Sequence, residues 1–171
     1  EDSTFKVSRD VQTHELVVTG MSNLHLEVIL SRLKSRYEID VDSRQPKIPH
    51  KETITTKASA QYKHKKQTGG KGQYAEVYLR IEPLERGAGF EFTTKIVGGA
   101  IPSQYIPAVE KGLRETIAKG ILSNNPIADV KVELYDGTFH NVDSSEAAFK
   151  IAASKAFRLA FDDAKPVLLE P

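Results

Sequence analysis

One segment of the chain, residues 61–74, gathers basic side chains and glycines and contains no acidic residue. Its glycines, at positions 69, 70 and 72, can bring backbone N–H groups close to a phosphate or a base edge. Lysines at the tip of a hairpin can neutralise phosphates and release their counterions. The residue types therefore indicate either contact with a nucleic acid or a solvated turn whose charges favour solubility. Four lysines supply the charge: Lys63, Lys65, Lys66 and Lys71.

The glycines of this segment do not match the nucleotide-binding loops. A Walker loop has the pattern G-x-x-x-x-G-K-[ST], whereas Gly70-Lys71 is followed here by Gly72. The G-x-G-x-x-G spacing of dinucleotide-binding loops is not met either. We therefore expect neither kind of nucleotide site in this segment.

A second candidate is His140, which lies between a predicted strand and a predicted helix. An imidazole there can titrate near neutral pH, donate hydrogen bonds or stack on a base, or it can simply decorate a loop. Asp143 and Ser144 are close enough in sequence to suggest a Ser-His-Asp hydrolase. However, Asp143 is better used on the free N–H groups of the helix start, and no G-x-S-x-G elbow presents a nucleophile. We expect no catalytic residue in this chain.

Composition restricts the other classes of function. The chain has 171 residues, 24 Lys and Arg, 23 Asp and Glu, and no Cys, so its net charge is +1 and thiolate chemistry is excluded. The remaining histidines match no metal-ligand spacing, and we predict no metal site. No apolar run is long enough to cross a membrane, and there is no secretion signal. The chain begins at Glu1, so we expect it to be a piece of a larger protein.

The first 48 residues predict an incomplete α+β unit. Two short strands are expected near residues 5–7 and 16–18, and a third at Ile39 and Val41. Residues 43–49, with two prolines, predict a linker. A split βαβ arrangement would need one more strand and helix before this unit. Ser22 can cap a helix whose apolar stripe has helical spacing: Leu26, Ile29, Leu30 and Leu33.

The rest of the chain predicts an α+β layer structure of at least four strands and two helices. Strands are expected over 51–62, 74–81, 90–92 and 130–134, the last of them ending at Asp136-Gly137. In the second of these, apolar residues alternate with larger polar ones and predict a half-buried strand with one inward face: Ala75, Val77, Leu79 and Ile81. Helices are expected over 103–119 and from Asp143 onward. In the first helix, helical spacing puts four apolar residues on one face: Ile106, Val109, Leu113 and Ile117. The second helix has a predicted buried face of mostly small residues: Ala148, Ile151, Ala152 and Ala156.

Seven strings of residues, in the same order along nearly the whole chain, resemble bacterial elongation factor G, the translocation GTPase. The match is specific because it rests on all of the strings together rather than on one motif. They are Gly20-Met-Ser-Asn-Leu-His-Leu-Glu27, Gln67-Thr-Gly-Gly-Lys-Gly-Gln-Tyr74, Gly89-Phe-Glu-Phe92, Ile96-Val-Gly-Gly-Ala-Ile-Pro102, Tyr105-Ile-Pro-Ala-Val109, Val142-Asp-Ser-Ser-Glu146 and Lys165-Pro-Val-Leu-Leu-Glu-Pro171.

The resemblance implies a fold and a division into domains. Residues 1–48 would be the rear of domain III, a ferredoxin-like unit truncated at its N-terminus. Residues 49–165 would be domain IV, an α/β sandwich like the second domain of ribosomal protein S5, and residues 166–171 would begin domain V. The GTP-binding domain would lie outside the chain. GTP and Mg²⁺ would accordingly belong to the parent protein, with no cofactor in this fragment.

The resemblance also implies a function and a site. Domain IV of the family reaches the ribosomal decoding site as tRNA and mRNA advance, so the expected partners are small-subunit rRNA, tRNA and mRNA, in the cytoplasm and not at a membrane. Lys63, Lys65 and Lys66 would support a tip made of two loops. The tip residues, carried over one by one, are Gln67, Thr68, Gly69, Gly70, Lys71, Gly72, Gln73 and His140.

The chain departs from the commonest family pattern at three places. Ser22-Asn23 replaces a usual Gly-Glu, Ala75-Glu76 replaces a usual Gly-His, and Asn124-Asn125 stands where Gly plus an aromatic is common. None of these changes touches His140 or the glycine loop. They keep open the alternative that the parent is a paralogous ribosome-recycling or ribosome-protection GTPase with the same fold.

Overall fold

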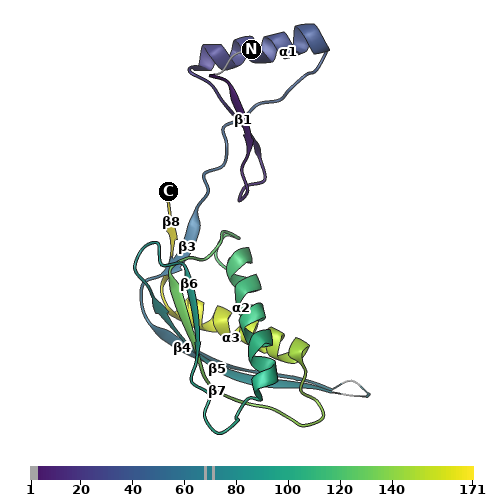
Figure 1. Ribbon diagram of the computed structural model, residues 1–171, viewed down its shortest axis with the longest axis vertical. Coiled ribbons are helices and arrows are strands. Elements are labelled where there is room, and N and C mark those ends of the chain that lie inside the picture. Colours follow the sequence, from purple (N-terminus) through teal and green to yellow (C-terminus); the bar gives the residue numbers. More distant parts are fainter. Residues whose placement is uncertain (1–3, 68, 71) are drawn as a thin grey trace. The chain divides into compact units, whose positions relative to one another are not determined.

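The computed structural model describes residues 4–67, 69–70 and 72–171 and divides the chain into two compact units, Glu1–Pro49 and His50–Pro171 (Figure 1). Both helices and strands occur in each unit, so the predicted α+β class is confirmed. Within the described ranges, no helix combines the length and the apolar character needed to cross a bilayer.

The first unit is a β-hairpin followed by a helix. Strands β1 (Lys6–Arg9) and β2 (Leu16–Thr19) pair antiparallel, and α1 spans Asn23–Tyr37. Ser22 caps the helix as predicted, because its side chain accepts a hydrogen bond from the His25 backbone N–H at 3.2 Å. The predicted apolar stripe of α1 is half-buried, and no described residue of this unit is buried. The unit therefore has an apolar face but no core of its own.

The strand predicted at Ile39 and Val41 is wrong. These side chains are 50% and 45% exposed, and the backbone around them has no regular secondary structure. Two alternating apolar residues were a weak signal, and neither hairpin strand pairs with them. The following segment is held by hydrogen bonds to the Glu15 carboxylate from the Arg44 side chain and the Lys47 backbone N–H, both at 2.9 Å.

The second unit is built on a four-stranded sheet in the order β4-β5-β7-β6. The strands are β4 (Ala58–Lys66), β5 (Gln73–Pro83), β6 (Phe90–Thr94) and β7 (Val130–Thr138), and only the β6–β7 pair is parallel. A short 3₁₀ turn, η1 (Ser103–Tyr105), precedes α2 (Ile106–Lys119), and α3 spans Glu146–Asp163. Figure 1 shows both helices on the same face of this sheet. A separate antiparallel pair joins β3 (Lys51–Ile54) to β8 (Pro166–Leu169).

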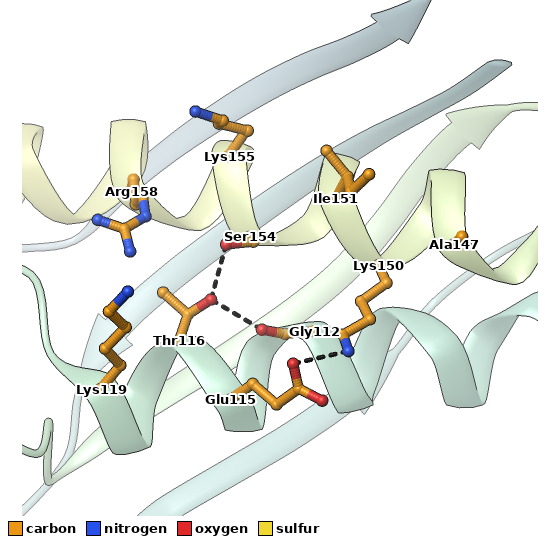
Figure 2. Close-up of a pocket in the computed structure, with 10 residues that line it drawn as sticks. All are labelled: Gly112, Glu115, Thr116, Lys119, Ala147, Lys150, Ile151, Ser154, Lys155 and Arg158. Carbon is orange, nitrogen blue, oxygen red and sulfur yellow. Dashed lines mark hydrogen bonds and ion pairs between the residues drawn. The ribbon is translucent and has the colours of Figure 1, made fainter. Parts of the chain in front are cut away.

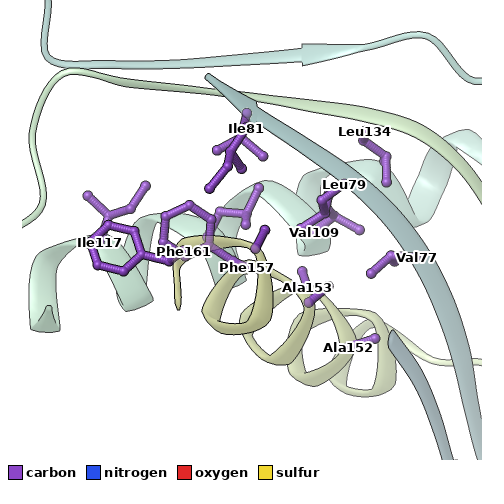
Figure 3. Packing of buried hydrophobic residues seen from close by; sticks show 14 of the residues in the cluster. Val77, Leu79, Ile81, Val109, Ile117, Leu134, Ala152, Ala153, Phe157 and Phe161 are labelled. Atoms are coloured by element: carbon purple, nitrogen blue, oxygen red, sulfur yellow. The ribbon is translucent and has the colours of Figure 1, made fainter. Parts of the chain in front are cut away.

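The core lies between the sheet and the two helices (Figure 3). The predicted alternation of β5 is confirmed, because Ala75, Val77, Leu79 and Ile81 are all fully buried. The predicted face of α3 is partly wrong: Ile151 is 38% exposed. Close packing of the alanines turns Ile151 outward, and the helix buries three rings that the pattern did not include: Phe149, Phe157 and Phe161.

Glycine at position 137 lets β7 run further than predicted, through Asp136-Gly137 to Thr138. A Cβ on Gly137 would lie 2.5 Å from the backbone carbonyl oxygen of Glu76 on the neighbouring strand, so only glycine fits there. A register shift at Tyr78/Leu79 accompanies the extension. The predicted strand end at Asp136-Gly137 therefore lies inside β7, and β7 carries the chain to the same end of the sheet as the β4–β5 hairpin, since Glu76 pairs with Thr138.

Candidate nucleic-acid interface

The glycine loop closes the β4–β5 hairpin. The last cross-strand pair is Lys66 with Gln73, the first residue of β5, so Gln67, Gly69, Gly70 and Gly72 lie at the turn between the paired strand ends (Figure 1). Gln67, Gly69 and Gly70 are exposed, and Gly69 has a left-handed φ of 56°. The predicted site residues Thr68 and Lys71 lie outside the described residues.

Gly72 contacts the second loop directly. Its backbone N–H donates to the Asp143 carboxylate at 3.1 Å, and the Tyr74 N–H donates to the Asp143 carbonyl at 2.9 Å. A Cβ on Gly72 would lie 3.1 Å from the Asp143 carboxyl carbon and 3.2 Å from the Lys66 carbonyl oxygen. Glycine at this position therefore allows the two loops to approach each other.

A buried serine completes the connection between the loops. The Ser144 hydroxyl donates to the Tyr74 carbonyl at 2.7 Å and accepts from the His140 backbone N–H at 2.9 Å. Ser144 is only 8% exposed, so water does not readily replace these bonds. The structure thus brings the glycine loop and the His140 loop together, although the Ser144–Tyr74 bond joins residues that are 70 positions apart in the chain. We call the two joined loops, residues 67–73 and 138–144, the tip.

The His140 ring faces outward with a defined hydrogen-bonding role. Its side chain is 55% exposed, and Nδ1 lies 3.3 Å from the backbone N–H groups of both Val142 and Asp143. Because Nδ1 accepts these hydrogen bonds, the neutral ring carries its proton on Nε2. No described residue bonds Nε2, so the tip presents a hydrogen-bond donor to the solvent side. The Tyr74 ring lies next to the imidazole, with 6.3 Å between centroids.

Gln73 is only partly available to a ligand. Its amide oxygen is 2.8 Å from Nε2 of His64, and the side chain is half-buried. This pair ties the two strands of the hairpin just below the turn. What Gln73 can offer a ligand is therefore its amide N–H₂ group.

The three described lysines do not form one patch. Side chains alternate along a strand, so Lys63 and Lys65 share the face of β4 away from the helices, while Lys66 lies on the other face. The Lys63 ammonium lies 5.4 Å from the centre of the Tyr74 ring. All three side chains are exposed.

The fold also brings acidic groups to this basic segment. Glu76 is buried beneath the tip and accepts hydrogen bonds from Thr138, Gln61 and the Tyr74 hydroxyl. The Thr138 hydroxyl contributes most to holding the pKa of Glu76 below its ordinary value. The Glu76 carboxylate is therefore charged, and with Asp143 it reduces the net positive charge that the sequence segment suggested.

The geometry excludes the hydrolase alternative. Ser144 Oγ bonds the backbone N–H of His140 rather than its ring, and the ring nitrogen Nδ1 faces backbone N–H groups instead of the hydroxyl. The imidazole is thus not placed to take a proton from Ser144. The described part of the chain also contains no cluster of three His, Asp or Glu side chains that could hold a metal ion.

The glycine loop does not fit GTP. A P-loop leads from a strand into the N-terminus of a helix, whose free N–H groups bind the phosphates. Here the loop joins two antiparallel strands. The residues of this loop therefore cannot hold GTP and Mg²⁺ in the P-loop manner.

Sequence reasoning missed the residues that hold the tip together. Asp143 was predicted to cap α3, but the cap is Ser145, whose side chain accepts from the Ala148 N–H at 3.2 Å. Both residue types suit an N-cap, so the sequence is compatible with two helix starts that differ by two residues. Because Ser145 is the N-cap, Asp143 and Ser144 precede the helix and can form hydrogen bonds with the β4–β5 hairpin. The pattern alone gave no sign of that role.

Comparisons with known proteins agree with this geometry. The family model described as elongation factor G, domain IV, matches residues 46–165, and the model for domain III matches residues 1–45. An "Elongation factor G-like protein" of Thermotoga maritima is 52% identical over 170 residues, which cover 99% of this chain and 25% of that protein. A crystal structure of a protein from Thermus thermophilus superposes with a TM-score of 0.85 at 45% identity, over 100% of this chain and 25% of that one.

The chain thus spans about a quarter of the length of the relatives that it matches. The predicted fold, a partial ferredoxin-like unit followed by an S5 domain 2-like sandwich, is confirmed by these matches. The assignment of residues 166–171 to a following domain stays a prediction. Both matched domains and the identity over nearly the whole chain lead to one conclusion: the chain belongs to the elongation factor G family, as a fragment with domain III and domain IV sequence.

Proposed function

We propose that the second unit of this chain enters the ribosomal decoding site and that its tip promotes the movement of tRNA and mRNA. The observation that carries the proposal is the joined tip, in which Ser144 and Asp143 hold two distant loops together and His140 presents an Nε2–H donor. The proposed partners are small-subunit rRNA, tRNA and mRNA, in the cytoplasm.

The chemistry of the tip suits a factor that must serve every codon. An RNA helix exposes 2′-hydroxyl groups and base edges in a wide, shallow minor groove. One imidazole donor and the backbone N–H groups of the exposed Gly69 and Gly70 can bond such acceptors without reading a sequence. Lys63, Lys65 and Lys66 add attraction to the phosphate backbone. The parent protein would bind GTP and Mg²⁺ in a domain outside this chain and hydrolyse GTP there.

Internal hydrogen bonds give the tip the stiffness that this role needs. A loop that blocks backward slippage must keep its shape under load. The Ser144 and Asp143 bonds cross-link the tip at its base, and the His64–Gln73 pair braces the hairpin below the turn. A force on the tip therefore acts on the sheet and its core as well.

The test uses the full-length parent with His140→Ala. We expect translocation to slow about tenfold, which corresponds to an increase of roughly 1.4 kcal/mol in its activation free energy. Ribosome-stimulated GTP hydrolysis should stay nearly unchanged. His140→Gln, which keeps a side-chain N–H donor, is the matched control and should recover part of the rate. Equal loss of both activities in His140→Ala would contradict the proposal.

The second candidate function is ribosome recycling or ribosome protection by a paralogous GTPase. The departures from the common family pattern at residues 22–23, 75–76 and 124–125 support this alternative. The full-length protein would then split ribosomal subunits or release a bound inhibitor but would not advance tRNA. Measuring translocation and subunit splitting with the same preparation decides between the two.

A further inference from the structure

The second unit has a groove between its two helices, on the side away from the sheet (Figure 2). The groove has a volume of about 520 Å³ and is separate from the tip residues described above. Its walls are the exposed faces of α2 and α3. The residues that line it are Gly112, Glu115, Thr116, Lys119, Ala147, Lys150, Ile151, Ser154, Lys155 and Arg158.

The groove carries an excess of positive charge. It contains four basic side chains and one acid, and that acid, Glu115, pairs with Lys150 at 2.7 Å. Lys119, Lys155 and Arg158 have no acidic partner within the part of the chain that the structure describes. Three uncompensated charges in one groove are notable in a chain whose net charge is only +1.

The arrangement of these cations is not explained by helix stability alone. Lys119 lies in the last turn of α2, where a positive charge stabilises the helix dipole. The last turn of α3 contains no basic residue, so Lys155 and Arg158 have no such role. Figure 2 shows the ends of the Lys119 and Arg158 side chains pointing toward each other from opposite walls. Like charges that face each other repel unless an anion lies between them.

The floor of the groove is polar and firmly held. Gly112 brings the helices close, since a Cβ there would lie 2.5 Å from the Lys150 carbonyl oxygen. Thr116 is buried, and its hydroxyl lies 2.8 Å from both the Gly112 carbonyl and the Ser154 hydroxyl. The single hydroxyl proton of Thr116 goes to the Gly112 carbonyl, which can only accept, so the Ser154 O–H donates to the Thr116 oxygen and the two hydroxyls fix each other in place.

We propose that this groove is a second RNA-contact surface, which binds the phosphate backbone of an RNA segment separate from the one at the tip. This inference rests on the proposed function, because ribosomal contact is what makes RNA the expected polyanion. A guanidinium and two ammonium groups match phosphate oxygens in charge and in hydrogen bonding. Ile151 is the one large apolar side chain in the groove, which does not suit a membrane surface.

The test measures binding of the 171-residue chain to a fluorescein-labelled RNA duplex by fluorescence anisotropy, over about 50 to 200 mM KCl. The groove variant is Lys155→Gln with Arg158→Gln. The matched control is Lys51→Gln with Lys111→Gln, which removes the same charge from exposed lysines that do not line the groove. Glutamine favours helices, so the fold should persist, and thermal unfolding checks this.

The salt dependence gives the readout. We expect the slope of log Kd against log salt to fall by about 1 to 2 in the groove variant and to stay nearly unchanged in the control, since each lost phosphate contact removes about 0.7 to 0.9. Equal slopes in the two variants, or no binding by the wild-type chain at low salt, would overturn the proposal. Poly-glutamate that binds as tightly and is lost in the same variant would overturn the assignment to RNA.

A failure of the groove proposal can be told apart from a failure of the proposed function, because the two are tested by different experiments. That function is tested at His140 in the full-length protein by translocation and GTP hydrolysis. A tip that fails there, with the groove slopes as expected, would refute only the role of the tip. Normal effects at His140, with groove and control slopes alike, would refute only the groove.

Discussion

Removing the Ser144 hydroxyl should loosen the tip without unfolding the core. Ser144→Ala deletes one bond donated to the Tyr74 carbonyl and one accepted from the His140 N–H. Each polar group left without a partner beside the buried Ser144 costs about 1–3 kcal/mol, and two of them lower the free energy of opening the tip by about 2–6 kcal/mol. The lower figure corresponds to about thirtyfold faster amide hydrogen exchange through opening of the tip, because about 1.4 kcal/mol is a factor of ten.

Native-state hydrogen exchange of the 171-residue chain measures this effect. The amides of Gly72 and Tyr74, which donate to Asp143, should exchange about thirtyfold faster or more in Ser144→Ala. Amides of the central strand, such as that of Leu79, should stay at the wild-type rate. Ser59→Ala makes the same chemical change at an exposed serine and serves as the control. Exchange at Gly72 and Tyr74 within about twofold of wild type would refute the reasoning that Ser144 joins the loops.

Three further predictions concern the body of the second unit. Glu52→Gln should lower the free energy of unfolding by about 2–5 kcal/mol in urea titrations, because the buried carboxylate accepts four backbone N–H groups and an amide can satisfy only some of them. Burial alone raises the pKa of Glu52, but those N–H groups hold that pKa below its ordinary 4.5. Its stabilising effect should therefore be complete above about pH 4.5 and decline as the pH falls through the folded pKa, and Glu52→Gln should flatten this acid limb of the stability curve. Gly112→Ala should lower the stability of the fold by about 1–3 kcal/mol in thermal unfolding, because the new Cβ would meet the Lys150 carbonyl. This is the reverse of the usual effect, since Gly→Ala normally stabilises a helix. An unchanged or higher Tm would contradict the close contact between the helices.

Regular elements with a strong pattern could be predicted from the sequence. The alternation of β5 gave its buried residues. Helical spacing gave the apolar face of α2, of which Val109, Leu113 and Ile117 are buried and Ile106 is half-buried. Both patterns extend over several residues and agree with their surroundings. The strand at Ile39 and Val41 rested on two residues and failed for lack of a pairing partner.

The composition of the tip was predictable, but its construction was not. Glycines, lysines and His140 stand out as residues with little structural use, and resemblance to the family placed them together. What brings the loops together is the pairing of β5 with β7 and the extension of β7 to Thr138. Pairing between distant strands depends on the tertiary fold and leaves no mark in a local pattern. The roles of Asp143 and Ser144 follow from that pairing.

The most direct test of the central claim is where the tip lies on the ribosome. The chain contributes no cysteine, so Gln67→Cys in an otherwise cysteine-free parent protein provides one attachment point on the exposed turn. An iron chelate tethered there cleaves the nearest RNA when hydroxyl radicals are generated on the bound complex. Our account predicts cleavage of small-subunit rRNA around the decoding site and of the tRNA anticodon region. Cleavage confined to large-subunit rRNA, or no cleavage from a bound and active factor, would contradict it.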